Sequence, residues 1–197
     1  MNKKFEKIYQ FKITLQDLTP PIWRRIQIPE TYTFWDLHVA IQDAFGWADY
    51  HLHEFKILHP TSKQNVRIGF PDDDFGRDIL VNWKERISDY FTLANNKSNY
   101  IYDFGDDWVH SVVLEKILTC EKNISYPRCI NGKRACPPED CGGIRGYEEF
   151  LKAIKDPKHE QHKEMIEWIG YDFDSEHFDP NDIKFDDPEK RRKIAFS

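Results

Sequence analysis

The segment Arg134–Tyr147 gathers side chains that could carry chemistry. Cys136 and Cys141 flank the adjacent carboxylates of Glu139 and Asp140 in a stretch rich in proline and glycine. Proline fixes φ and lacks an N–H donor, while glycine reaches positive φ, so this composition predicts a shaped loop instead of a helix or regular strand. Thiols and carboxylates on a rigid loop can ligate a metal ion, and carboxylates can also transfer protons. We therefore expect this loop to contribute to a site.

Histidines and cysteines offer two possible sets of metal ligands. His51 and His53 are two residues apart in a strand-like segment, which predicts that they share one face and could coordinate one metal ion. Cys129, Cys136 and Cys141 could supply thiolates to zinc, which accepts nitrogen and sulfur in a tetrahedral shell. The intervening stretches of six and four residues fit the paired spacing of structural zinc sites poorly. The alternative is that these cysteines are small buried thiols that pack a tight loop.

A second group of polar residues lies in the predicted hairpin Tyr102–His110. It contains Asp103, Asp106 and Asp107 and ends at His110. Carboxylate and imidazole groups together could perform acid–base catalysis or bind a cation. Aspartates are also common in hairpin turns for structural reasons, because they accept backbone hydrogen bonds and tolerate the left-handed region. Both interpretations stay open from the sequence alone.

These segments together predict one polar groove. Its expected residues are His51, His53, Asp103, Asp106, His110, Glu139 and Asp140. A divalent metal such as zinc is a possible cofactor of this groove, because mixed histidine and carboxylate ligands suit zinc or manganese better than calcium. The catalytic residues, if the protein is an enzyme, are not identified by the sequence.

The first third of the chain supplies elements that could position these residues. Residues 9–16 alternate apolar and polar side chains, which predicts a half-buried strand, and residues 22–28 predict a second strand. A helix is expected from Thr33, with Asp36 placed to complete a capping box and Gly46 at the C-terminal cap. A third strand is expected over residues 51–58.

The remaining residues predict further elements and long loops. Residues 59–80 are polar and turn-rich, with the acidic run Asp72–Asp74 in a loop, and a second loop is expected over residues 126–146. The other expected elements are a short helix within residues 83–91, a hairpin of residues 100–104 and 108–118, and helices over residues 147–154 and 162–169. The whole predicts a single α+β domain over residues 5–185, a mainly antiparallel sheet with helices packed on one side, followed by a charged C-terminal tail over residues 186–197.

Composition and charge exclude several classes of protein. A hydrophobic content of 40% and an aromatic content of 15% predict a packed globular protein. The net charge of −6 disfavours nucleic-acid binding, although Lys190–Lys193 could form a local basic patch. The sequence has no apolar run long enough for a membrane span, and its first residues lack the apolar core of a signal peptide. We therefore expect a cytoplasmic protein with no membrane association, whose oligomeric state the sequence does not give.

A series of short motifs resembles one known family. The motifs are Tyr9-x-Phe-x-Ile-x-Leu, Pro20-Pro-Ile-Trp-Arg-Arg, Phe34-x-x-Leu-His-x-x-Ile-Gln-x-x-Phe-Gly-Trp, His51-Leu-His-x-Phe, Tyr102-Asp-Phe-Gly-Asp-x-Trp-x-His and Ala135-Cys-Pro-Pro-Glu-Asp-Cys-Gly-Gly. In this order they resemble the plasmid pRiA4b ORF-3-like family, also labelled insertion-element passenger or TnpR-like, over roughly residues 5–185. The resemblance implies a small α+β protein that is often carried on mobile elements. The family's members are uncharacterised proteins with no demonstrated catalysis.

Two hypotheses about function follow. The first is a binding or accessory protein associated with mobile elements, which uses the polar groove without catalysis. The second is a metal-assisted enzyme, hydrolase-like, which uses the same histidines and carboxylates to hold a divalent ion. A nucleic-acid accessory protein that uses Arg24 and Arg25 is a third hypothesis, and the acidic net charge counts against it.

Overall fold

The first two strands form where the alternation of side chains predicts them. The computed structural model describes residues 5–71 and 78–195, so the acidic run Asp72–Asp74 lies outside the described residues. Strand β1 (Lys7–Leu15) buries Phe11, Ile13 and Leu15 almost completely, and it pairs antiparallel with β2 (Ile22–Pro29). Alternation places every second side chain on the same face of the sheet, and here that face is the core.

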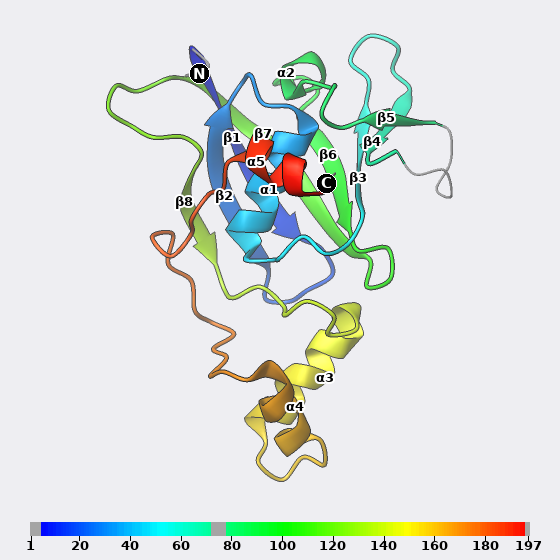
Figure 1. The fold of residues 1–197 in the computed structure, drawn as a ribbon, viewed down its shortest axis with the longest axis vertical. Coiled ribbons are helices and arrows are strands. Elements are labelled where there is room, and N and C mark those ends of the chain that lie inside the picture. Colours follow the sequence, from blue (N-terminus) through cyan, green and yellow to red (C-terminus); the bar gives the residue numbers. More distant parts are fainter. Residues whose placement is uncertain (1–4, 72–77, 196–197) are drawn as a thin grey trace.

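Eight strands of the described chain form one sheet (Figure 1). The other six are β3 (His53–Leu58), β4 (Asn65–Gly69), β5 (Ile79–Val81), β6 (Lys97–Tyr102), β7 (Trp108–Thr119) and β8 (Arg128–Lys133). Their order across the sheet is β5-β4-β3-β6-β7-β1-β2-β8. All neighbouring pairs are antiparallel except β4 and β5, which are parallel.

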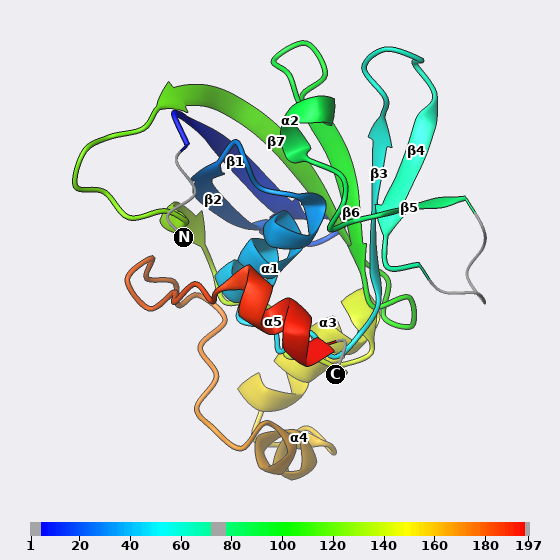
Figure 2. The same ribbon diagram turned by 45° about the horizontal axis from the view of Figure 1, so that its top comes forward.

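Helix α1 (Phe34–Phe45) provides most of the helical contribution to the core, and the sheet curves around it (Figure 2). The expected capping box is present, since the Thr33 side chain accepts from the Asp36 N–H and the Asp36 carboxylate accepts from the Thr33 N–H. Gly46 ends the helix in the left-handed conformation with φ of 80°. Phe34, Leu37 and Ile41 are fully buried against the sheet.

The remaining helices lie around this unit. Helix α2 (Ile87–Tyr90) is a single turn, and α5 (Pro188–Ala195) packs on α1. Helices α3 (Gly143–Lys155) and α4 (His162–Ile169) pack against each other beyond one end of the sheet (Figure 1). The α+β class with one mainly antiparallel sheet is therefore confirmed, whereas the packing of all helices on one side is not.

Three regions differ from the expectations. Residues 59–80 and 126–146, expected as loops, contain the strands β4, β5 and β8. Each of these strands has at most six residues and lies near an edge of the sheet, so its own sequence carries little periodic signal. The expected charged tail contains α5, which is held by a hydrogen bond from Trp35 Nε1 to the Pro188 carbonyl at 2.9 Å.

Candidate functional site

Three of the expected groove residues come together in one cluster. His51 Nε2 lies 2.9 Å from Asp140 Oδ1 and 3.6 Å from Asp103 Oδ2. The cluster is open to solvent, because the Asp140 side chain is 64% exposed and that of His51 is 31% exposed, while Asp103 is the most buried of the three. We call these three residues the His51 cluster.

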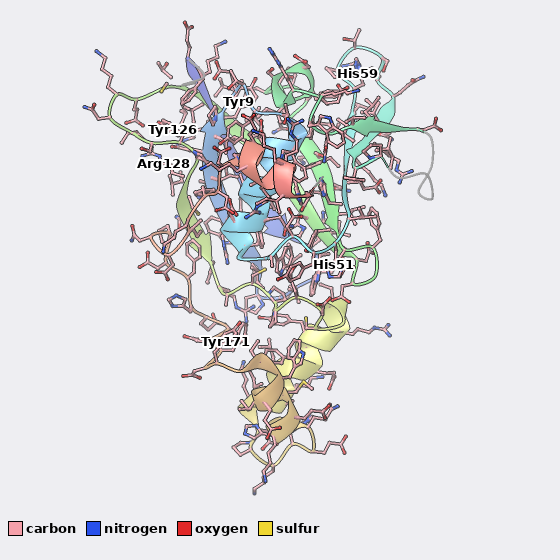
Figure 3. All side chains as sticks on the ribbon, in the orientation of Figure 1. Tyr9, His51, His59, Tyr126, Arg128 and Tyr171 are labelled. Atoms are coloured by element: carbon pink, nitrogen blue, oxygen red, sulfur yellow. The ribbon has the colours of Figure 1, made fainter. Side chains whose placement is uncertain are left out.

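Sheet pairing brings His51 beside Asp103. Strands β3 and β6 are antiparallel, with His53 opposite Tyr102, so the residues just before β3 and just after β6 meet at the same end of the sheet. The Asp103 N–H extends this pairing by donating to the Leu52 carbonyl at 2.9 Å. Figure 3 shows His51 at the end of the sheet that faces α3.

The Pro/Gly loop brings the third residue, Asp140, to this end of the sheet. Trp47 Nε1 donates to the Pro137 carbonyl at 2.9 Å, and the Ala48 N–H donates to Glu139 Oε2 at 2.9 Å. The Tyr102 hydroxyl donates to Glu139 Oε1 at 2.5 Å. These bonds fix the backbone on both sides of Pro138, so Asp140 is presented to His51 by a loop that is anchored to two different elements.

Glu139 and Asp106, both expected in the groove, have structural partners instead. Both carboxylate oxygens of Glu139 accept the hydrogen bonds that fasten the loop. Asp106 Oδ2 accepts from the Gly142 N–H at 3.1 Å, at the position that precedes α3. A carboxylate at the start of a helix satisfies a free N–H and interacts favourably with the helix dipole. Asp106 therefore joins the hairpin to α3.

The His51 cluster has the spacing of a metal site. The three ligand atoms lie within 4.8 Å of one another. Ligands about 2.1 Å from a tetrahedral zinc ion stand about 3.4 Å apart, so the His51 separations of 2.9 and 3.6 Å need only small movements to accept an ion. One imidazole and two carboxylates are ligands that suit zinc or manganese.

His53, expected beside His51, lies in the core instead. Its ring stacks on that of His38 from α1 with 3.4 Å between centroids and an interplanar angle of 8°. Burial, followed by the neighbouring His38, lowers the pKa of His53 well below its ordinary value, so the imidazole is neutral. Asn82 Nδ2 lies 2.8 Å from its Nε2. The prediction that His53 shares the groove with His51 gains no support from this geometry.

A second group, His38, Asp49 and His53, also has ligand atoms within 4.8 Å. Its geometry disfavours a metal, because imidazole lone pairs lie in the ring plane and two parallel rings cannot both direct them at one ion. Both ring nitrogens of His38 are also in use, with Nε2 at 2.8 Å from Asp49 Oδ1 and Nδ1 at 2.8 Å from the Tyr100 hydroxyl. The Asp49 carboxylate accepts from Nε2–H, so this nitrogen has no free lone pair for a metal ion.

His110 lies in the core of the sheet and does not reach the cluster. It is fully buried on β7, against the rings of Phe45 and Trp47 from the end of α1. Burial lowers its pKa to about 3, so it is neutral at ordinary pH. Its Nδ1 donates to the Trp108 carbonyl at 3.0 Å. The expected acid–base role of His110 therefore has no geometric support.

Cys129 of β8 and the loop residues Cys136 and Cys141 do not assemble a metal site in the described part of the chain. The two groups of possible ligands there contain no cysteine. Burial raises the pKa of Cys136 well above its ordinary value, and burial together with Asp106 raises that of Cys141 to about 12. Burial also raises the pKa of Cys129. For Cys136 and Cys141, protonated and partly buried thiols fit the alternative expectation of small apolar side chains in a tight loop.

Arg24 and Arg25, the arginines of the nucleic-acid hypothesis, both bind groups within the protein. Arg24 is 4% exposed, with its guanidinium between the rings of Phe45 and Phe178 and with Nε donating to the Ala44 carbonyl at 2.8 Å. Arg25 forms a bidentate pair with Glu115. The local basic surface that nucleic-acid binding would need is therefore absent at this position.

The buried His38, Asp49 and Tyr100 network was not expected from the sequence. A signal for it exists, because His38 falls on the apolar face of α1 that Phe34, Leu37 and Ile41 define. A polar residue on an apolar face must find hydrogen-bonding partners inside the protein. Those partners come from β6 and from the segment after α1, which the helical pattern alone does not reveal.

The family profile of plasmid pRiA4b ORF-3-like protein matches residues 7–182 of this chain. The chain belongs to this family. One relative of this chain is the "Uncharacterized protein y4hQ" of Sinorhizobium fredii (strain NBRC 101917 / NGR234). It is 35% identical over 170 residues, which cover 85% of this chain and 84% of the relative. A solved structure that this chain resembles is the "Crystal Structure of Protein of Unknown Function MM3350 from Methanosarcina mazei Go1". The two share 49% sequence identity and a TM-score of 0.87 over 92% of this chain and 100% of that one.

These findings confirm the resemblance drawn from the motifs. The pRiA4b ORF-3-like family is a family of uncharacterised proteins. Membership therefore identifies the fold, and an activity has to be argued from the site residues. None of the described helices is long and apolar enough to cross a membrane.

Proposed function

We propose that this pRiA4b ORF-3-like protein is a binding protein whose ligand site is the His51 cluster, and that a divalent cation is the ligand that the cluster fits. The observation that carries the proposal is the approach of one imidazole and two carboxylates, with all three ligand atoms within 4.8 Å. A cation bound there would neutralise the two carboxylates that lie beside the His51 ring. The open side of the cluster would leave coordination positions for a further ligand.

Metal titration tests the proposal. Tag-free protein stripped with a chelator is titrated with Zn²⁺ and with Mn²⁺ by calorimetry, and the dialysed complex is analysed for metal. We expect about one equivalent of metal per chain, with proton release that rises at lower pH, because the ligands must be deprotonated. His51→Ala and Asp103→Asn should each abolish this binding.

Asp107→Asn is the matched control for Asp103→Asn. Asp107 is in the same hairpin turn, also at positive φ, and it is exposed and outside the cluster. Asparagine tolerates the left-handed region, so the backbone is preserved. Binding that is equal in Asp107→Asn and lost in Asp103→Asn supports the site. No metal uptake by the wild-type protein contradicts it.

A second candidate function is metal-assisted hydrolysis. It is favoured by the number of ligands, because catalytic zinc sites use three protein ligands and keep a position for water. The metal would lower the pKa of that water and make it a nucleophile at neutral pH. The neutral, buried His53 and His110 count against a larger catalytic constellation. Metal-stimulated cleavage of generic ester or phosphoester substrates that is lost in Asp103→Asn would favour hydrolysis over binding.

Three expectations from the sequence stay proposals. The description of the family as plasmid ORF-3-like supports an accessory role for a mobile element. A cytoplasmic location follows from the sequence expectation alone. The same holds for the division into a domain of residues 5–185 and a short charged C-terminal segment of residues 186–197.

A further inference from the structure

A pocket of about 700 Å³ lies beside the His51 cluster. Its walls are the end of α1, the Pro/Gly loop, the end of α4 and the segment that follows α4. The volume is that of a typical site for a small organic molecule. Asp140 belongs both to the pocket lining and to the His51 cluster, so the two sites are adjacent.

The pocket lining is more acidic than basic, and its one basic side chain, His177, is paired with Asp182 outside the lining. Four carboxylates line it, those of Glu139, Asp140, Asp172 and Asp174, and the lining includes no lysine or arginine. Within residues 5–71 and 78–195, no ion pair involves Glu139, Asp172 or Asp174. Acidic groups around a concave surface focus a negative potential into it.

Aromatic side chains form the apolar part of the same lining. Phe45 and Trp47 are buried at the end of α1, whereas Trp168 and Tyr171 are 45% and 60% exposed. Phe173 packs on Phe150 of α3 with 5.3 Å between ring centroids, which connects the pocket to the helical pair. Tyr171 lies next to α4 in Figure 3.

This combination selects for one chemical class of ligand. Aromatic faces attract cations through their quadrupole, most strongly in the case of tryptophan, and quaternary ammonium ligands are held in such aromatic surroundings. An anion would meet four carboxylates, and a neutral molecule would gain no charge–charge attraction from them. We propose that the pocket binds an organic ammonium ion with an apolar body, its charge held by Asp172 and Asp174 and its apolar part packed on the exposed Trp168 and Tyr171.

Three probes with a common aromatic body test the charge requirement. Benzyltrimethylammonium is the cation, benzyl alcohol is the neutral compound and phenylacetate is the anion. Binding to the full chain is followed by two-dimensional NMR and by calorimetry. We expect the cation alone to bind, with shifts confined to residues of the pocket, and with an affinity that falls as salt is added.

Paired variants test the location. Asp172→Asn with Asp174→Asn should weaken the binding of the cation at least about tenfold, since both charges are removed. Glu148→Gln with Glu160→Gln changes the net charge equally at exposed positions outside the lining, and we expect unchanged binding. Trp168→Ala should weaken binding and Trp168→Phe should restore part of it. Equal binding of the neutral probe, equal losses in both double variants, or no binding of the cation would each overturn the proposal.

The metal proposal and the ammonium proposal can fail separately. Asp103 is in the His51 cluster and does not line the pocket, whereas Asp172 and Asp174 line the pocket and are not in the cluster. Asp103→Asn should therefore remove metal binding and keep ammonium binding. The Asp172→Asn and Asp174→Asn double variant should do the reverse.

Discussion

The Tyr102 hydroxyl joins the sheet to the Pro/Gly loop by donating a hydrogen bond to Glu139 Oε1 at 2.5 Å. The Tyr102 hydroxyl oxygen also accepts from the Tyr50 N–H at 3.0 Å. Burial is the main reason that the pKa of Tyr102 is raised, with Glu139 adding to the effect, so the hydroxyl keeps its proton and stays a donor. Glu139 thus positions the neighbouring Asp140 without belonging to the cluster itself.

The first prediction concerns this contact. Tyr102→Phe should lower the free energy of unfolding by about 1–3 kcal/mol, because it leaves a carboxylate oxygen and a backbone N–H without their partner. It should also weaken metal binding, since Asp140 loses its support. Urea denaturation and metal titration measure the two effects. Tyr50→Phe is the control, because Tyr50 is 77% exposed. An equal loss of stability and metal affinity in Tyr50→Phe would contradict a specific role for the Tyr102–Glu139 hydrogen bond.

The second prediction concerns the start of α3. A Cβ atom on Gly143 would lie 2.6 Å from the backbone oxygen of Asp106, and Gly143 has φ of +67°. Gly143→Ala should therefore force α3 away from the hairpin and cost more than the roughly 1 kcal/mol of strain that a left-handed conformation imposes. Gly170→Ala is the matched control, because Gly170 has a similar φ of +72° and a Cβ atom added there would have no neighbouring atom within 4 Å. Equal thermal stability of the two variants would show that α3 does not press on the hairpin.

The third prediction concerns the pH dependence of stability. His110 has a folded pKa of about 3, below its ordinary value near 6.5, so the unfolded chain binds a proton that the folded protein does not. Its contribution to stability is complete above pH 6.5 and is lost as the pH falls from 6.5 towards 3. The loss is about 1.4 kcal/mol for each pH unit within this window. His53, whose pKa is also lowered by burial, should add a loss of the same sign.

Urea denaturation at several pH values measures this slope. His110→Phe should reduce the slope between pH 6 and pH 4 by roughly the contribution of one histidine, whatever it does to stability at neutral pH. Ile8→Val is the control, because it creates a small cavity at a fully buried position and should cost about 1 kcal/mol with no change of slope. An unchanged slope in His110→Phe would mean that this ring takes up its proton in the folded protein.

The fourth prediction concerns α5. Arg191 Nη2 lies 2.6 Å from Asp43 Oδ1 and 2.5 Å from Asp186 Oδ2, and the Asp43 side chain is only 5% exposed. Arg191→Ala should release α5 from α1 and cost about 2–4 kcal/mol, because it leaves a nearly buried carboxylate unpaired. Protease cleavage within residues 188–195 should become faster. Lys193→Ala removes an exposed charge from the same helix, and a comparable effect there would rule out a specific role for Arg191.

Local patterns determined the early elements of the fold. Alternation in β1 and the capping signals of Thr33, Asp36 and Gly46 act over a few residues, so the sequence predicts them without knowledge of the rest of the chain. The family motifs likewise identify the pRiA4b ORF-3-like family from residue types in order. Strand β8 has no such local signal, because its formation depends on pairing with β2.

The membership of the His51 cluster was decided by tertiary structure. His51, Asp103 and Asp140 were all candidates from the sequence. So were His53, in the same motif as His51, and His110, in the same motif as Asp103, and both are buried. Which imidazole reaches solvent depends on where β3 begins and on which face of β7 meets α1. Burial then removes the charge from His53 and His110, since a charged imidazole is costly in an apolar core. Sequence supplied the possible ligands, and the pairing of β3 with β6 and the anchored loop selected three of them.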